Sequence, residues 1–311
     1  MIWHIVAFKV QKILIKDKTP FVNIFFLRAG LAGRGWTPLD TQTAKERLTA
    51  CLKEYDNLLV AFSGGVDSTL LVAMAQQVIG PAVVALTAES AIHPPREIKH
   101  ARQLAVDLGI RHIQLRSQEM SLSDFIANRS DRCYVCKKQL FQDIFKYARE
   151  SGFAHVAHGA NLDDLKDFRP GLRAATEMGV VAPLIDAGLT KNDIRRLARQ
   201  MGLPNWNQAA GACLASRIPY GQPISSERLK MVAQAEERLH ALGFDACRVR
   251  HHGSVARIEV PSRDIAKLLR DPIRQKIVDR LTTIGFAHVA LDMEGYRQGS
   301  LNRGLKASGQ E

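Results

Sequence analysis

A glycine-rich turn between an apolar strand-like run and an apolar helix-like run constrains this chain more than any other feature. The segment 63–68 reads Ser-Gly-Gly-Val-Asp-Ser. The adjacent Gly64 and Gly65 allow backbone conformations that a side chain forbids, and the helix that follows presents unpaired N–H groups and the positive end of its dipole. Such a turn binds phosphate groups, and the hydroxyl groups of Ser63 and Ser68 add further donors.

Asp67 separates this turn from a Walker A loop, which has a longer glycine spacing and a lysine before its Ser/Thr. An acidic residue here suits magnesium-bound pyrophosphate. The turn resembles the PP-loop of ATP pyrophosphatases, which cleave ATP between the α and β phosphates and adenylate a substrate oxygen. This resemblance implies ATP and Mg²⁺ as cofactors. The alternative is a glycine turn that only caps an ordinary helix.

Strands and helices alternate from position 43 onward. The pattern predicts helices at 43–55, 69–78, 95–108 and 191–201, and strands at 58–62, 82–87, 112–115 and 155–158. Such alternation indicates βαβ units, and therefore an α/β fold with a doubly wound parallel sheet that has helices on both faces. Ligands of such folds bind at the carboxyl ends of the strands, where the phosphate loop also lies.

The sequence pattern changes after Pro204. The pattern there predicts a helix at 226–242, strand-like runs at 246–250 and 255–260, a helix at 263–269 and a last strand at 287–291. We expect a smaller C-terminal α+β domain for substrate binding and oligomerisation. The predicted organisation is a tail at 1–42, a PP-loop domain at 43–204, a cysteine-bearing linker at 205–223, the smaller domain at 224–304 and a tail at 305–311.

Composition narrows the class of partner. Lys and Arg outnumber Asp and Glu by 43 to 31, a formal charge of +12 that favours anionic partners. The aromatic fraction is only 6%, and aromatic and basic residues do not interleave, so no nucleic-acid partner is expected. No apolar run approaches the roughly 20 residues that span a bilayer. Five cysteines, an odd number with one Cys-x-x-Cys pair, favour a reducing cytoplasm over a secreted disulfide framework.

Three further motifs accompany the phosphate loop. They are Cys133-x-x-Cys136, the run 158–164 with Arg169 and Pro170 after it, and the run 213–221, Cys-Leu-Ala-Ser-Arg-Ile-Pro-Tyr-Gly. In this order the motifs resemble those of the LarE family, and the resemblance spans about 43–303. It implies an ATP-dependent sulfur transferase that adenylates the carboxylates of pyridinium-3,5-biscarboxylic acid mononucleotide and replaces oxygen with sulfur. The product serves nickel-pincer cofactor synthesis, which implies a downstream nickel-insertion protein as a partner and a homo-oligomeric enzyme.

By this resemblance Cys213 occupies the sulfur-delivering position. Some members of the family sacrifice the sulfur of a single cysteine, whereas others hold a [4Fe–4S] cluster with three cysteines and leave one iron open. Cys133, Cys136 and Cys213 favour the cluster, because three thiolates suit iron and sulfur. Alternatives are a zinc site with the same ligands, or a Cys133–Cys136 redox pair beside a sacrificial Cys213. Cys51 and Cys247 lie outside the motifs and are predicted to be core thiols.

An anionic substrate requires cations, preferably guanidinium groups that engage both oxygens of a carboxylate. Arg248 and Arg250 alternate along a strand-like run, and Arg297 follows the last predicted strand. The family has substrate-binding arginines in matching segments, and Arg217 adds a cation beside the transferring cysteine. Glu237 resembles an acidic residue near that cysteine and is predicted to accept a proton or to ligate a metal.

The remaining ATP contacts are expected at strand ends. Thr87 ends the second predicted strand and would lie beside the adenosine, and Gly159, Asn161 and Asp164 follow a later strand near the phosphates. Asp163 could equally cap a helix. Two rival functions remain open: another PP-loop adenylating enzyme, such as a tRNA thiolase or an amidotransferase-type synthetase, and a non-catalytic nucleotide-sensing or iron–sulfur carrier protein.

Overall fold

The computed structural model describes residues 39–166, 169–209 and 211–297, all within one compact unit that spans Pro38–Glu311. Residues 1–38 and 305–311 of the predicted tails lie outside these described residues. Within them, no helix combines the length and apolar character needed to cross a bilayer. The predicted domain boundaries at 204 and 223 stay predictions.

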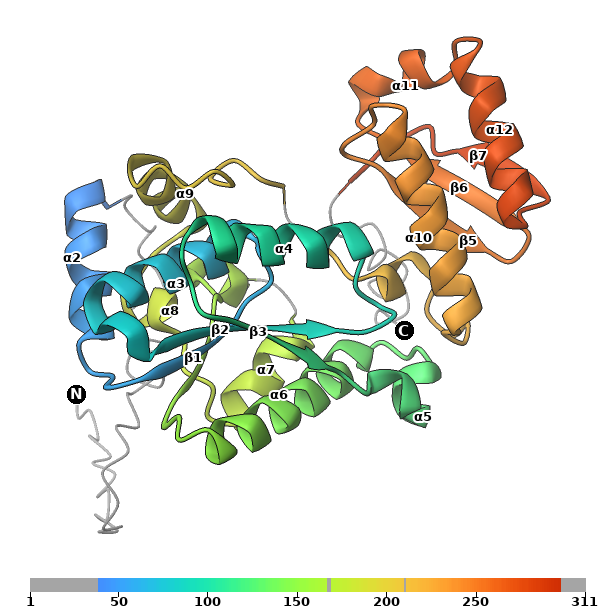
Figure 1. Ribbon diagram of the computed structural model, residues 1–311. Coiled ribbons are helices and arrows are strands. Elements are labelled where there is room, and N and C mark those ends of the chain that lie inside the picture. The colour runs from blue at the N-terminus through green and yellow to red at the C-terminus, as the bar shows by residue number, and fades with distance from the viewer. Residues whose placement is uncertain (1–38, 167–168, 210, 298–311) are drawn as a thin grey trace, which may run out of the picture. The chain divides into compact units, whose positions relative to one another are not determined.

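The first sheet has four parallel strands in the order β3-β2-β1-β4 (Figure 1). The strands are β1 (Leu58–Ala61), β2 (Val83–Glu89), β3 (His112–Arg116) and β4 (Val156–His158). The helices that connect and cover them are α2 (Thr41–Leu52), α3 (Val66–Ile79), α4 (Pro95–Asp107), α5 (Ser123–Ile126), α6 (Arg132–Glu150), α7 (Pro170–Glu177), α8 (Pro183–Asp186) and α9 (Lys191–Gln200). The predicted doubly wound parallel sheet is confirmed.

The side chains of β1 point alternately to the two faces of this sheet, and both faces are covered by buried residues. Leu58 and Val60 pack with buried residues of α2, α3, α4 and α9, whereas Leu59 packs with buried residues of α6 on the other face. Successive strand residues point to opposite faces, so a strand that is apolar at every position needs helices on both sides. Figure 1 shows α3 and α4 on one face of the sheet and α6 and α7 on the other.

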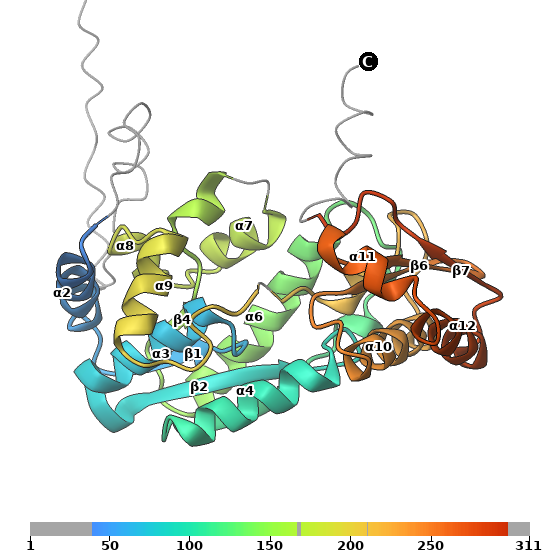
Figure 2. The same cartoon turned by 90° about the horizontal axis from the view of Figure 1, so that it is seen from above.

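The second sheet is small and mixed. Its strands are β5 (Arg248–His252), β6 (Val255–Glu259) and β7 (His288–Leu291), with β5 antiparallel and β7 parallel to β6. Its helices are α10 (Ser226–Ala241), α11 (Ser262–Leu268) and α12 (Ile273–Ile284). These elements have a core of their own, and Figure 2 shows α10 and α12 packed beside each other. The predicted smaller α+β part is confirmed.

Helices α5, α6, α7, α8 and α12 are absent from the predicted elements. The pattern for α6 was nevertheless in the sequence, because the buried Leu140, Phe141, Ile144 and Ala148 recur at helical spacing. Between α9 and α10 the described residues are irregular except for the 3-10 helix η4 (Leu214–Arg217). A separate apolar cluster packs this linker against α5, α6 and α10. Helix α6 and the linker together carry the cysteine motifs.

Candidate functional site

The phosphate loop connects the carboxyl end of β1 to α3. Gly65 is the N-cap of α3 and makes no side-chain cap bond, which leaves the first N–H groups of the helix without a side-chain partner. Gly64 has a φ of +71°, and a Cβ there would lie 3.0 Å from Ala101 Cα. A Cβ on Gly159 would lie 2.8 Å from the backbone nitrogen of Ser68. Both positions therefore require glycine, because the protein's own backbone approaches them closely.

Two hydroxyl groups shape the inside of this loop. The Oγ atoms of Ser63 and Ser68 lie 3.2 Å apart, and Ser68 Oγ donates to the Gly65 carbonyl at 3.1 Å. Asn205, from the linker, donates its Nδ2 to the Gly64 carbonyl at 2.8 Å and to Thr69 Oγ1 at 2.9 Å. The linker therefore stabilises the loop, a role that sequence reasoning missed because the two segments are far apart in the chain.

Asp67 faces a lysine that the sequence analysis did not include among the site residues. Lys191 Nζ lies 2.5 Å from Asp67 Oδ2, and Asn161 Nδ2 lies 3.4 Å from Asp67 Oδ1. Burial raises the pKa of Asp67, and the Lys191 charge opposes that rise. Lys191 is the first residue of α9, whose N-cap Thr190 completes a capping box, so a sequence signal for its placement existed.

The two aspartates after β4 have different contacts. Asp163 Oδ2 accepts from the backbone nitrogen of Lys191 at 2.8 Å, so Asp163 holds the start of α9 and not the start of the helix that directly follows it. Asp164 accepts from the backbone nitrogen of Asn161 at 3.0 Å and pairs with Arg169 at 2.7 Å. Thr87 is buried at the end of β2 and donates to the Phe62 carbonyl at 2.7 Å. The ATP contacts of Thr87 and Asp164 stay predictions.

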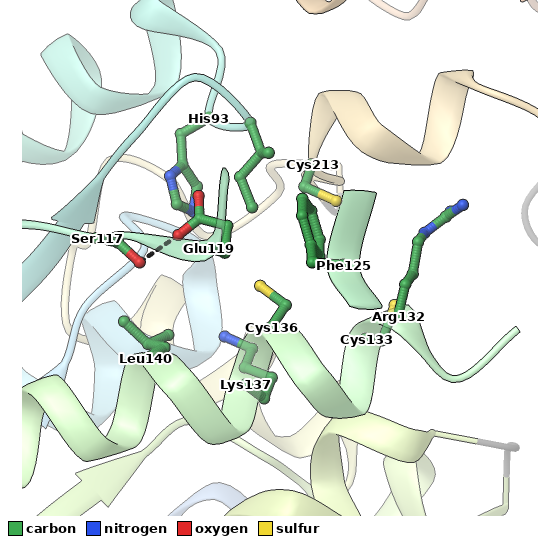
Figure 3. Close-up of a pocket in the computed structure, with 11 residues that line it drawn as sticks. His93, Ser117, Glu119, Phe125, Arg132, Cys133, Cys136, Lys137, Leu140 and Cys213 are labelled. Atoms are coloured by element: carbon green, nitrogen blue, oxygen red, sulfur yellow. Dashed lines mark hydrogen bonds between the residues drawn. The ribbon is translucent and has the colours of Figure 1, made fainter. Parts of the chain in front are cut away.

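The three motif cysteines line one cavity of about 110 Å³, called here the cysteine pocket. Its lining residues are Ile92, His93, Ser117, Glu119, Phe125, Arg132, Cys133, Cys136, Lys137, Leu140 and Cys213. Figure 3 shows Cys136 on α6 and Cys213 on the linker at opposite sides of this pocket. The pocket thus joins cysteines from segments far apart in the sequence.

Burial dominates the electrostatics of the pocket. It raises the pKa of Cys136 to about 12, and the nearby Lys137 opposes that rise. It also raises the pKa of Cys133, whereas Arg132 and Lys137 lower it. The Glu119 carboxylate, fully buried in the wall, accepts hydrogen bonds from the hydroxyl groups of Ser90 and Ser117. Burial therefore disfavours the thiolate forms of Cys133 and Cys136, and a bound cation or metal is what would favour them.

Three thiols that converge on one pocket fit a soft metal centre in donor chemistry. Within the described parts of the chain, no three His, Cys, Asp or Glu residues are grouped closely enough to hold a metal ion as they stand. The donor set therefore fits, while the present side-chain positions do not form a closed ligand group.

Arg217 and Glu236 anchor the turn that carries Cys213. Arg217 is 1% exposed and pairs with Glu236 through Nε at 2.8 Å and Nη2 at 3.0 Å. Its Nη1 donates to the carbonyls of Ala212 at 2.7 Å and Cys213 at 3.0 Å. These contacts make Arg217 a structural support of the cysteine turn, and its substrate contact stays a prediction. Glu237 is exposed, so the structure does not bring it to this turn; its neighbour Glu236 takes that place.

The other predicted arginines have different environments. Arg250 is buried, pairs with Glu259 through Nε and Nη2, each at 2.9 Å, and donates Nη1 to the Ser216 carbonyl at 2.7 Å. Arg248 stacks over the Tyr296 ring at 5.2 Å. Arg297 is exposed. Arg248 and Arg250 both lie on β5, as expected, but Arg250 points into the core against the cysteine turn.

The sequence is similar to known proteins over most of its length. The asparagine synthase family model matches residues 45–140. An uncharacterized protein of Synechocystis sp. is 40% identical over 260 residues, 84% of this chain and 97% of that protein. The pyridinium-3,5-bisthiocarboxylic acid mononucleotide synthase of Lactiplantibacillus plantarum is 37% identical over 262 residues, 84% of this chain and 94% of that protein.

A third relative, an uncharacterized protein of Methanocaldococcus jannaschii, is 28% identical over 240 residues, 77% of this chain and 90% of that protein. With its parallel sheet and its glycine loop at the end of β1, the chain belongs to the LarE family of the PP-loop ATP pyrophosphatase superfamily.

Proposed function

We propose that this protein is an ATP-dependent sulfur transferase that adenylates the carboxylates of pyridinium-3,5-biscarboxylic acid mononucleotide and replaces oxygen with sulfur, in nickel-pincer cofactor synthesis. The proposal rests on one observation: the phosphate loop and the cysteine pocket lie at the same edge of the first sheet. The phosphate loop follows β1, while the segments that line the cysteine pocket follow β2 at His93 and β3 at Ser117 and Glu119. Parallel strands end at one edge of the sheet, so an acyl adenylate formed at the loop would face the cysteines.

Activation begins at the phosphate loop. A substrate carboxylate oxygen attacks the α phosphorus of ATP, the bond between the α phosphorus and the bridging oxygen breaks, and pyrophosphate leaves. The N–H groups at the start of α3 and the Lys191 ammonium, which lies 2.5 Å from Asp67, would stabilise the charge that develops on pyrophosphate. A magnesium ion beside Asp67 would neutralise further phosphate charge. The ion pair with Asp67 holds the Lys191 ammonium at this edge of the first sheet.

Sulfur transfer completes the exchange. A sulfur nucleophile attacks the acyl carbon, and AMP leaves with the original carboxylate oxygen, so one oxygen is replaced by one sulfur. We propose that Cys133, Cys136 and Cys213 hold a [4Fe–4S] cluster for this step. When bound, such a cluster would supply an iron site for a hydrosulfide. The Arg217 contacts to the carbonyls of Ala212 and Cys213 fix the turn from which the third thiol reaches the pocket.

The test uses full-length protein, reconstituted anaerobically with iron and sulfide, and supplied with ATP, Mg²⁺ and the mononucleotide. We expect AMP and pyrophosphate in equal amounts, a thiolated product, and about four irons and four sulfides per chain. Replacing any one of the three pocket cysteines by serine should abolish the iron and the product. Cys51→Ser, half-buried on α2 outside the pocket, is the matched control and should retain both.

Other outcomes would contradict parts of the proposal. ADP and orthophosphate as products would exclude adenylation. A Cys213 residue lighter by one hydrogen sulfide after turnover, with Cys133 and Cys136 dispensable, would replace the cluster by sacrificial transfer. Absence of substrate-dependent pyrophosphate release would favour a nucleotide-sensing or carrier protein.

A further inference from the structure

Asn128 lies between the two segments that carry the cysteines. It is fully buried in the turn between α5 and α6, shortly before Cys133. Its φ of 55° makes it the one residue other than glycine with a left-handed backbone in the described part of the chain. Such a conformation costs free energy and persists where the surroundings enforce it, which is common at functional sites.

The side chain of Asn128 holds the linker that follows Cys213. Nδ2 donates to the carbonyls of Pro219 and Gln222, each at 2.8 Å, and lies 3.4 Å from the carbonyl of Ile218. The backbone adds a further bond, because the Gly221 nitrogen donates to the Asn128 carbonyl at 3.1 Å. One residue thus engages four positions of a segment about 90 residues away in sequence.

The same side chain also holds the Cys133 segment. Asn128 Oδ1 accepts from Arg132 Nη1, and Arg132 is buried, lines the cysteine pocket and stacks over the Tyr220 ring at 4.5 Å. Tyr220 belongs to the linker, so Arg132 joins the two segments a second time. All polar groups of Asn128 are engaged, and a buried amide with this many partners cannot be replaced by another side chain without leaving carbonyls unpaired.

We propose that Asn128 is a positioning residue that locks the Cys213 linker against the Cys133–Cys136 helix and so assembles the cysteine pocket. Apolar contacts such as those of the linker are not directional, whereas the hydrogen bonds of the amide fix the linker carbonyls relative to the start of α6. The effect of Asn128 on sulfur transfer rests on the proposed function. Its effect on the distance between the cysteines does not.

The test measures thiol proximity directly. In a Cys133→Ser background, a fluorogenic reagent with two thiol-reactive arms links Cys136 to Cys213, and peptide mass spectrometry identifies the pair. Asn128→Gly removes the amide while glycine accepts the left-handed backbone without strain. We expect the yield of the Cys136–Cys213 link to fall by about tenfold or more, with ATP affinity unchanged.

Asn57 offers a matched control. Its side chain also connects two loops: Nδ2 donates to the Gly152 carbonyl at 3.1 Å, and Oδ1 accepts from the Ala154 nitrogen at 2.9 Å. Asn57 precedes β1, so it lies at the opposite end of that strand from the phosphate loop. Asn57→Gly should leave the cross-link unchanged. An unchanged cross-link in Asn128→Gly, or an equal fall in Asn57→Gly, would overturn the proposal.

A second variant separates positioning from folding. Asn128→Asp keeps the shape and an oxygen toward Arg132 but cannot donate to the Pro219 and Gln222 carbonyls, so the cross-link should fall here too; if it persists in a folded Asp variant, the proposal is wrong. With an intact Cys133 and the reconstituted protein, both variants should release pyrophosphate normally and form less thiolated product. If wild type forms no such product while the cross-link still responds to Asn128, the proposed function fails and the positioning role stands.

Discussion

Arg217 and Glu236 form a buried ion pair across two elements, with Nε 2.8 Å from Oε1 and Nη2 3.0 Å from Oε2. Arg217 ends the 3-10 helix η4 behind Cys213, and Glu236 lies on α10. The same Glu236 accepts from the backbone nitrogen of Val249 on β5 at 3.0 Å. One carboxylate therefore connects the cysteine turn, a helix and a strand of the second sheet.

Glu236→Gln should destabilise the protein strongly. The substitution leaves the buried Arg217 charge without its counterion, a loss that costs about 3–5 kcal/mol when one partner of a buried pair is removed. Urea denaturation measures the change in the free energy of unfolding. Glu237→Gln, the same change at the exposed neighbour, is the control and should stay within about 0.5 kcal/mol. Equal effects at the two positions would contradict the pairing.

Lys191→Met should reduce pyrophosphate release by roughly 10²–10³, the range for removing one positioned donor at a developing negative charge. The change also removes the charge that holds the pKa of Asp67 down, so burial raises that pKa further. Lys166→Met is the matched control, because Lys166 is 57% exposed and pairs with Asp163 instead. Steady-state pyrophosphate assays compare the two, and similar rates would exclude a catalytic contact for Lys191.

Arg297→Ala should weaken binding of the mononucleotide by roughly ten- to hundredfold, since a charge-assisted hydrogen bond contributes about 1.5–3 kcal/mol. Because Arg297 is exposed, stability should not change. Calorimetric titrations with substrate and with ATP test this, and Arg263→Ala, at a side chain 84% exposed on α11, serves as the control. An equal loss of ATP affinity would refute separate sites.

Arg250→Ala should behave differently from Arg297→Ala. It leaves Glu259, 1% exposed, with only the partly exposed Arg257 as a charged partner, and it frees the Ser216 carbonyl. We expect a loss of about 3 kcal/mol or more in stability. Thermal and urea unfolding measure it. A variant as stable as wild type but defective in substrate binding would instead make Arg250 a direct ligand.

Protonation of His158 should contribute to the loss of folding stability at acidic pH. Burial lowers the pKa of His158 from 6.5 to about 4, so between these values the unfolded chain binds more protons than the folded one. Stability from this group is therefore complete above pH 6.5 and is lost as the pH falls toward 4, on the order of 3 kcal/mol. His158→Gln should reduce this dependence of stability on pH, whereas His100→Gln, at an exposed position, should not. Identical pH dependences in the two variants would argue against a lowered pKa at His158.

The local patterns of the sequence determined the strands and helices around the phosphate loop. Gly64 and Gly65 at a strand-to-helix turn, and apolar runs with alternating helices, are signals contained within short windows, which is why the parallel sheet was predictable. The cysteine motifs were equally visible, although the helix that carries Cys133 and Cys136 was not predicted.

Tertiary structure decided which polar residues meet. Neighbours on a helix point about 100° apart, so only packing selected Glu236 over Glu237 as the partner of Arg217. The contact of Lys191 with Asp67 and the bonds of Asn128 to Pro219 and Gln222 join residues separated by about 90 positions or more, and no local period encodes such distances. Sequence alone therefore determined the chemistry that the chain carries, and the packing of α9, the linker and α10 decided where that chemistry is assembled.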